Sequence, residues 1–188
     1  MGIFDFVSGR VQKMNELGPA VLTPYHIRIK NYIYSKSVSE WSREEQLIAM
    51  AFEYGWWMVF YLFSYENDLF KKQIGGLDYG KLNALYVELV LWFIWHQMSL
   101  MEEADRKKID GNVLYDKVCD FFGADKEMAI SFWQNLKTAE NPIHAIFSVV
   151  CRTIGADGDD FALFVGFNKL SAAVHKKAIH DRGVLSTS

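Results

Sequence analysis

The chain has 188 residues, of which 51% are hydrophobic and 15% aromatic, so it can bury the core of one domain or of two small ones at most. Its three prolines and thirteen glycines do not give the composition of a long disordered linker. A formal net charge of −3 provides no electrostatic attraction to nucleic acid, so nucleic-acid binding is the first function class to be excluded.

The first part of the chain predicts a short amphipathic helix over residues 2–17, because its apolar residues recur at intervals of three and four. Gly18-Pro19 then ends that helix. Thr23-Pro24 resembles an N-cap followed by proline at the first helical position, so a second helix is expected to begin there. The local alternation in residues 27–34 leaves a strand open as the alternative.

Two long helices are expected in the middle of the chain, over residues 43–72 and 79–104. The first begins with a capping box, in which Ser42 is followed three residues later by Glu45. Gly75-Gly76 ends it. Because the connection between these helices is short, we expect them to pack as an antiparallel hairpin.

Four more helices are expected, over residues 112–122, 126–138, 142–154 and 160–178. Gly123 stops the first of them, and Asn141-Pro142 is a cap-plus-proline start for the third. The last aspartates of the turn at 155–160 can cap the fourth, and residues 180–188 are expected to form a loose tail. The predicted fold class is therefore all-α, a single-domain multi-helix bundle (1–188) built around a central antiparallel helix hairpin.

The most apolar segment, EYGWWMVFYLFSYE from Glu53 to Glu66, is too short to span a membrane. It has twelve residues between its carboxylates, whereas a spanning helix needs about 20 apolar residues. Between Glu88 and Glu102 there are thirteen residues, and two polar side chains interrupt them. No membrane span is therefore predicted, and the segment is expected to be a helix enclosed by other helices.

Polar side chains form one narrow stripe on each of the two long helices. With about 100° of rotation per residue, Ser64 falls near Glu53 on the first helix, and Ser99 falls near Glu88 on the second, with His96 at the side. An antiparallel register brings Glu53 level with His96 and Ser99, so we predict direct or water-bridged contact between them. The alternative is that these side chains reach solvent in grooves between helices.

The aromatic residues beside the stripe can line a pocket for an apolar ligand or can simply fill the core. The candidate ligand-binding residues are Glu53, Trp57, Glu88, Trp92, His96 and Ser99. The residues expected to be buried in the core are Trp57, Phe60, Phe63, Leu89, Trp92 and Ile146.

No catalytic or metal-binding motif is present. The chain has no Glu-x-x-His, which a ferritin-like di-metal site requires, and no metal is predicted, although Glu53, Glu88 and His96 leave a single carboxylate–imidazole site as an alternative. It also lacks a nucleophile elbow and a phosphate-binding glycine loop, so no catalytic residue or cofactor is named and enzymatic activity is left undecided.

Cys119 and Cys151 lie among apolar neighbours and have no metal-type spacing, so we expect buried thiols. The N-terminus has no basic segment of a secretory signal, and Phe6 stands where the myristoylation pattern needs Ser or Thr. The expected location is therefore the cytoplasm.

The leading functional hypothesis is a non-enzymatic helical protein-interaction module, either homo-oligomeric or bound to a protein partner. The positive indication is a surplus of Trp and Tyr, which are favoured at interfaces. The alternative is a binder of an apolar small molecule or cofactor, with its site between the helices at 43–72 and 79–104.

Overall fold

A computed structural model describes residues 19–64 and 79–182. Its elements are α2 (Pro19–Ile33), the 3₁₀ helix η1 (Val38–Glu40), α3 (Arg43–Ser64), α5 (Tyr79–Leu100), α6 (Glu103–Arg106), α7 (Gly111–Phe122), α8 (Lys126–Thr138), α9 (Pro142–Ile154) and α10 (Phe161–Arg182). The described ranges hold helices and no strand, so the predicted all-α fold class is confirmed. The predicted helix at 2–17 and the turn at Gly75-Gly76 lie outside them.

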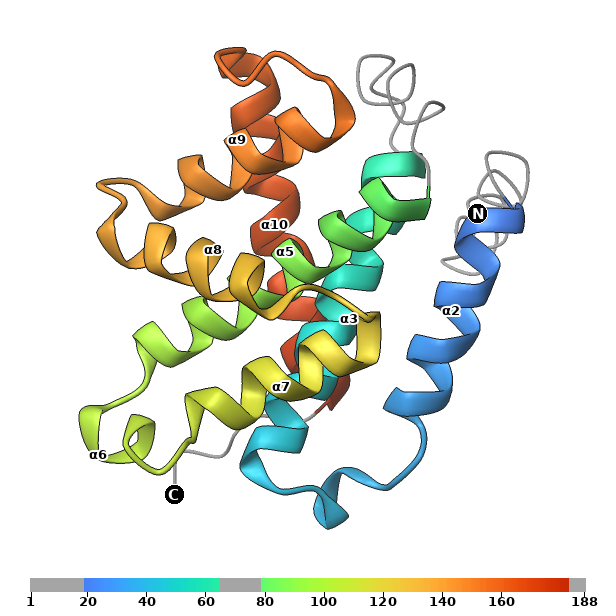
Figure 1. The fold of residues 1–188 in the computed structure, drawn as a ribbon, viewed down its shortest axis with the longest axis vertical. Coiled ribbons are helices and arrows are strands. Elements are labelled where there is room, and N and C mark those ends of the chain that lie inside the picture. The colour runs from blue at the N-terminus through green and yellow to red at the C-terminus, as the bar shows by residue number, and fades with distance from the viewer. Residues whose placement is uncertain (1–18, 65–78, 183–188) are drawn as a thin grey trace.

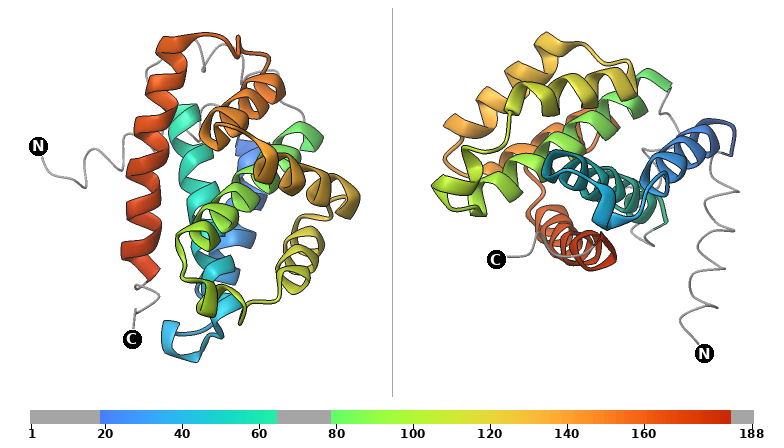
Figure 2. Two further views of the ribbon diagram at one scale, coloured as in Figure 1. Left: turned by 90° about the vertical axis from the view of Figure 1, so that its left-hand side faces the viewer. Right: turned by 90° about the horizontal axis from the view of Figure 1, so that it is seen from below.

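Helices α3 and α5 lie at the centre of the bundle (Figure 1). Helices α2 and α10 pack on α3, while α7, α8 and α9 pack on α5. Figure 2 shows α10 on one side of the central helices and α7 and α8 on the other. One cluster of buried side chains runs through all these layers, from Tyr25 on α2 to Ala178 on α10. The packing of α3 on α5 is compatible with the predicted central hairpin.

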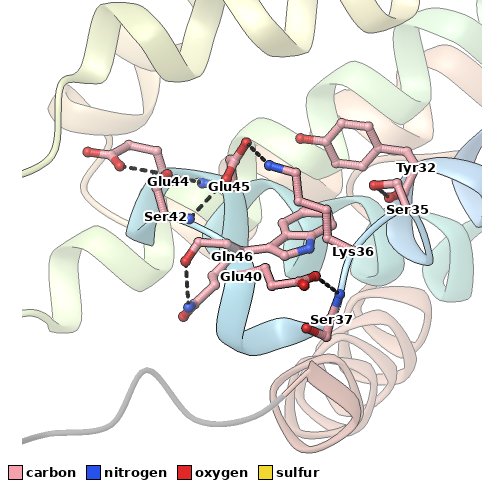
Figure 3. Close-up of polar contacts among 10 residues, drawn as sticks. Tyr32, Ser35, Lys36, Ser37, Glu40, Ser42, Glu44, Glu45 and Gln46 are labelled. Carbon is pink, nitrogen blue, oxygen red and sulfur yellow. Dashed lines mark hydrogen bonds and ion pairs between the residues drawn. The ribbon is translucent and has the colours of Figure 1, made fainter.

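The capping box predicted at the start of α3 is present (Figure 3). The backbone N–H of Glu45 donates to Ser42 Oγ at 3.2 Å, and the backbone N–H of Ser42 donates to Glu45 Oε2 at 2.9 Å. Lys36 adds an ion pair, with its Nζ 2.9 Å from Glu45 Oε1. Two amide donors that the helix itself cannot use are thus satisfied, and α3 begins at Arg43 as predicted.

Local signals also set the ends of the later helices. Gly123 follows α7 in the left-handed region, at φ +62°, where other residues are strained. Asn141 Oδ1 accepts the N–H of His144 at 3.3 Å at the start of α9, with proline next in the chain. Asp160 Oδ1 accepts the N–H of Leu163 at 3.0 Å at the start of α10. These predicted caps are confirmed.

Three predicted helix bounds are wrong. Helix α2 begins at Pro19 and not at Pro24. Proline suits the first position of a helix, because the N–H that it lacks would have no partner within the helix at that position. Helix α5 ends at Leu100, before the predicted end at 104, and neither glycine nor proline marks that end. Helix α10 continues to Arg182, so the first residues of the predicted loose tail are helical.

The predicted core is largely confirmed, with one exception. Phe60, Leu89, Trp92 and Ile146 are buried. Trp57 is only half-buried: it packs against the core, and Lys177 Nζ of α10 lies 4.6 Å from the centre of a Trp57 ring. The side chain of Phe63 lies outside the described part of the chain.

Helices α3 and α5 approach each other closely at Gly55. A Cβ atom at this position would lie 3.0 Å from Val90 Cγ2, so even an alanine here would require Val90 to shift by a few tenths of an ångström. Beside it, the rings of Tyr54 and Phe93 lie 5.0 Å apart. These contacts fall about one to two helical turns earlier along α5 than the sequence register places them.

None of the described helices combines the length and the apolar character that crossing a bilayer requires. Both cysteines are free and buried, as expected. Burial raises the pKa of the Cys151 thiol to about 11, so this thiol is protonated and unreactive at neutral pH.

Candidate functional site

Of the candidate ligand-binding residues, Trp92 and His96 lie in direct contact, with ring centroids 5.3 Å apart on α5. His96 also faces His175 of α10, at 4.7 Å between centroids. Glu53 is buried on α3, with 7% of its surface exposed. Its contact with His96 or Ser99 stays a prediction.

The contact between His96 and His175 belongs to a polar junction of α3, α5 and α10. Tyr54 of α3 and Ser171 of α10 share a hydrogen bond of 2.8 Å between their hydroxyls. Gln97 Nε2 is hydrogen-bonded to His175 Nε2. Because an amide nitrogen only donates, the ring nitrogen accepts, and the proton of a neutral His175 sits on Nδ1.

The surroundings keep His175 neutral. Burial, and then the neighbouring His96, lower the pKa of His175 from 6.5 to about 4. The junction is therefore built around an uncharged imidazole at neutral pH.

Glu88 lies elsewhere, at the contact between α5 and α9. Thr153 Oγ1 of α9 donates to Glu88 Oε2 at 3.4 Å. Burial raises the pKa of Glu88 to about 7, and this effect outweighs the hydrogen bond from Thr153 and the charge of Arg152. The carboxyl group is thus partly protonated at neutral pH.

Of the last two candidates, Trp57 lies beside α10, and Ser99 contacts the backbone of His96. Trp57 stacks on Tyr61, with ring centroids 5.6 Å apart, beside Lys177. Ser99 is exposed, and its hydroxyl donates to the carbonyl of His96 at 2.7 Å. Within the described ranges, no group of three or more His, Cys, Asp or Glu is placed to hold a metal ion, so the alternative site of Glu53, Glu88 and His96 is wrong.

A pocket of about 500 Å³ opens on the side of α5 that faces α7 and α8. This volume lies in the range of small-molecule sites, about 300–1,000 Å³. Of the predicted site residues, Ser99 alone is part of its lining. The lining residues are Trp95, Met98, Ser99, Arg106, Gly111, Asn112, Tyr115, Trp133 and Lys137.

Three aromatic rings in the lining are held by ring contacts. Tyr115 of α7 and Trp133 of α8 pack edge to face, with centroids 4.9 Å apart and planes at 83°. Trp95 stacks on Trp92 at 5.6 Å. Burial raises the pKa of Tyr115, so its hydroxyl keeps its proton at neutral pH and can donate a hydrogen bond. The rings form a preorganised apolar surface.

The charge of the pocket comes from Arg106 of α6 and Lys137 of α8, and its lining includes no acidic side chain. Five other cations in the described ranges form ion pairs with carboxylates: Lys36, Arg43, Lys107, Lys108 and Lys126. Within the described ranges, neither Arg106 nor Lys137 forms an ion pair with a carboxylate. The acidic neighbours of Arg106 on α6, Glu103 and Asp105, are already paired with other cations.

Sequence reasoning missed most of this pocket because its residues come from four helices that share no motif. One usable signal was present, since Trp133 and Lys137 are four residues apart and therefore lie on the same side of α8. Ser171 and His175 on α10 have the same spacing and were also missed. No protein-family model, curated protein or solved structure matches this chain.

Proposed function

We propose that this protein binds a small organic molecule in the pocket between α5, α7 and α8. One observation carries the proposal: aromatic rings on three helices and two cations without a carboxylate partner in the described ranges line the same pocket of about 500 Å³. Apolar walls with a few polar groups are typical of small-molecule sites. The rings would supply contact area, and the cations would orient the ligand.

This proposal moves the ligand site expected from the sequence to another side of α5. The interface between α3 and α5 is filled by large side chains that are fully buried, such as Tyr54, Tyr86 and Phe93. Their close packing favours a core role for that interface. The pocket, by contrast, is lined by half-buried and exposed side chains that a ligand could contact, with the buried Trp133 as the exception.

The role of a protein-interaction module has less support. The large apolar side chains with the greatest exposure are Tyr34, Leu100 and Phe161, and they lie after α2, at the end of α5 and at the start of α10. Apolar residues exposed singly are normal on soluble domains. Native mass spectrometry, which counts subunits, tests that role independently of any ligand.

The experiment for the ligand proposal is a fragment screen followed by two-dimensional NMR of the indole N–H groups. Bound fragments should shift the signals of Trp95 and Trp133 while leaving that of Trp41, which lies before α3, unchanged. The variant Ser99→Trp, which fills the pocket from an exposed position on α5, should abolish those shifts. Fragments that bind this variant as well as the wild type would contradict the proposal.

A further inference from the structure

We infer that the ligand of this pocket is a planar aromatic molecule that carries an acidic group, such as a carboxylate, sulfonate or phosphate. This inference rests on the proposed function and adds the chemical class of the ligand. Two independent properties of the lining support it: its charge and the arrangement of its rings.

The charge of the lining is opposite to that of the whole chain. The chain has a formal net charge of −3, whereas the lining includes two cations and no anion. The acidic side chains nearest in sequence to Arg106 are bound by other cations, at 2.6 Å for Glu103 with Lys107 and at 2.9 Å for Asp105 with Lys108. Their negative charge is thus largely compensated, and an anion in the pocket would be the partner that Arg106 and Lys137 lack in the described ranges.

The aromatic rings select for a flat, apolar body. Trp133 is buried and fixed by Tyr115, and Trp95 is fixed by Trp92. Rigid rings lose little entropy when a flat ligand stacks on them. Trp133 and Lys137 are one helical turn apart on α8, so a ring stacked on the indole would bring an attached acidic group near the ammonium.

The start of α7 also borders the pocket, but we assign the acidic group to the side chains and not to this helix end. Asp110 is the N-cap of α7, and its Oδ1 accepts the N–H of Asn112 at 2.9 Å. This carboxylate already satisfies one amide of the first turn and places negative charge beside it. Arg106 and Lys137 are therefore the groups that would recognise an anion.

The test compares two dyes with the same aromatic skeleton, anilinonaphthalene sulfonate and the uncharged phenylnaphthylamine. Their dissociation constants are measured by fluorescence titration with the wild type and with the double variant Arg106→Gln/Lys137→Gln. We expect the double variant to weaken binding of the sulfonate about tenfold or more and to change binding of the uncharged dye less than about twofold. Added salt should weaken binding of the sulfonate and leave binding of the uncharged dye unchanged.

The matched control is Lys169→Gln/Lys176→Gln, which removes the same charge from exposed positions on α10, across the bundle from α7 and α8 (Figure 2). This control should bind both dyes as the wild type does. Equal loss of sulfonate binding in the two double variants would show a long-range charge effect and overturn the inference. Unchanged sulfonate affinity in Arg106→Gln/Lys137→Gln would also overturn it.

The variant Ser99→Trp separates failure of the ligand class from failure of the proposed function. Suppose that Ser99→Trp abolishes binding of both dyes and that Arg106→Gln/Lys137→Gln changes both dissociation constants equally. The pocket then binds ligands, but the inference that its ligand carries an acidic group is wrong. If neither dye binds the wild type, or if Ser99→Trp leaves both affinities unchanged, the proposed function fails as well. Thermal melting of each variant confirms that it is folded.

Discussion

The imidazole rings of His96 and His175, from α5 and α10, lie with their centroids 4.7 Å apart. Gln97 donates to the second ring, and Phe93 packs against it at 4.7 Å. A proton added to His175 would meet an amide donor and a neighbouring imidazole in a buried setting. Protonation of His175 is therefore expected to weaken the packing of α10.

We predict that the contribution of His175 to the free energy of unfolding falls as the pH drops from about 6.5 toward 4. The pKa of His175 in the folded state is lowered to about 4 from 6.5, so the unfolded chain binds the proton more tightly over this range. Urea unfolding of His175→Gln should show a weaker loss of stability in the same range. His144→Gln on α9 is the control, and parallel curves for His175→Gln and wild type would contradict the assignment.

Glu88 should have the opposite effect over an overlapping pH range, so the two contributions are separated by comparing the variants and not by the wild type alone. Its folded-state pKa is raised from 4.5 to about 7, so the folded protein binds the proton more tightly, and stability is lost as the pH rises from about 4.5 through 7. Glu88→Gln should be more stable than the wild type at about pH 8, because glutamine carries no charge at this buried position. The expected difference is on the order of 2 kcal/mol, less than the full pKa shift corresponds to, since the carboxyl group is partly exposed. The two proteins should converge near pH 4. The control is Glu127→Gln, an exposed residue on α8, which should follow the wild type.

Removing the cap of α3 should destabilise the protein moderately. Ser42→Ala deletes the oxygen that accepts the N–H of Glu45, and such a loss costs about 1 kcal/mol. Chemical denaturation measures the change. Ser131→Ala, in the exposed middle of α8, should have no comparable effect, and equal costs for the two variants would show that the capping box contributes little.

The two tryptophans should differ in their contribution to stability. Trp92 is buried, with 3% of its surface exposed, so Trp92→Ala should cost about 3 to 5 kcal/mol. Trp57 is half-buried, so Trp57→Ala should cost at least about 1 kcal/mol less. Equilibrium unfolding of both variants provides the comparison, and an equal or larger loss of stability for Trp57→Ala would contradict the lower burial of Trp57.

The fold followed from the sequence mainly where its signals are local. The capping box of Ser42 and Glu45, the left-handed Gly123 and the Asn141-Pro142 start each involve a few neighbouring residues, so their geometry does not depend on the rest of the chain. The end of α5 at Leu100 carries no glycine or proline signal, so the sequence did not predict it.

The site could not be predicted in the same way. Helical periodicity places Glu88 and His96 on one side of α5, but it does not say which helix each one meets. Glu88 contacts α9, while His96 contacts α10. The pocket depends further on α6, α7 and α8, whose relative placement follows from packing angles that the sequence pattern does not contain.

The hydrogen bond between Tyr54 and Ser171 joins residues 117 positions apart in the chain. During synthesis at roughly 5–20 residues per second, α3 therefore waits about 6 to 23 s before its partner on α10 has been made. Throughout that interval the face of α3 that α10 covers is open to other nascent chains. Protection of this face by a chaperone on the ribosome is therefore expected to raise the yield of folded protein.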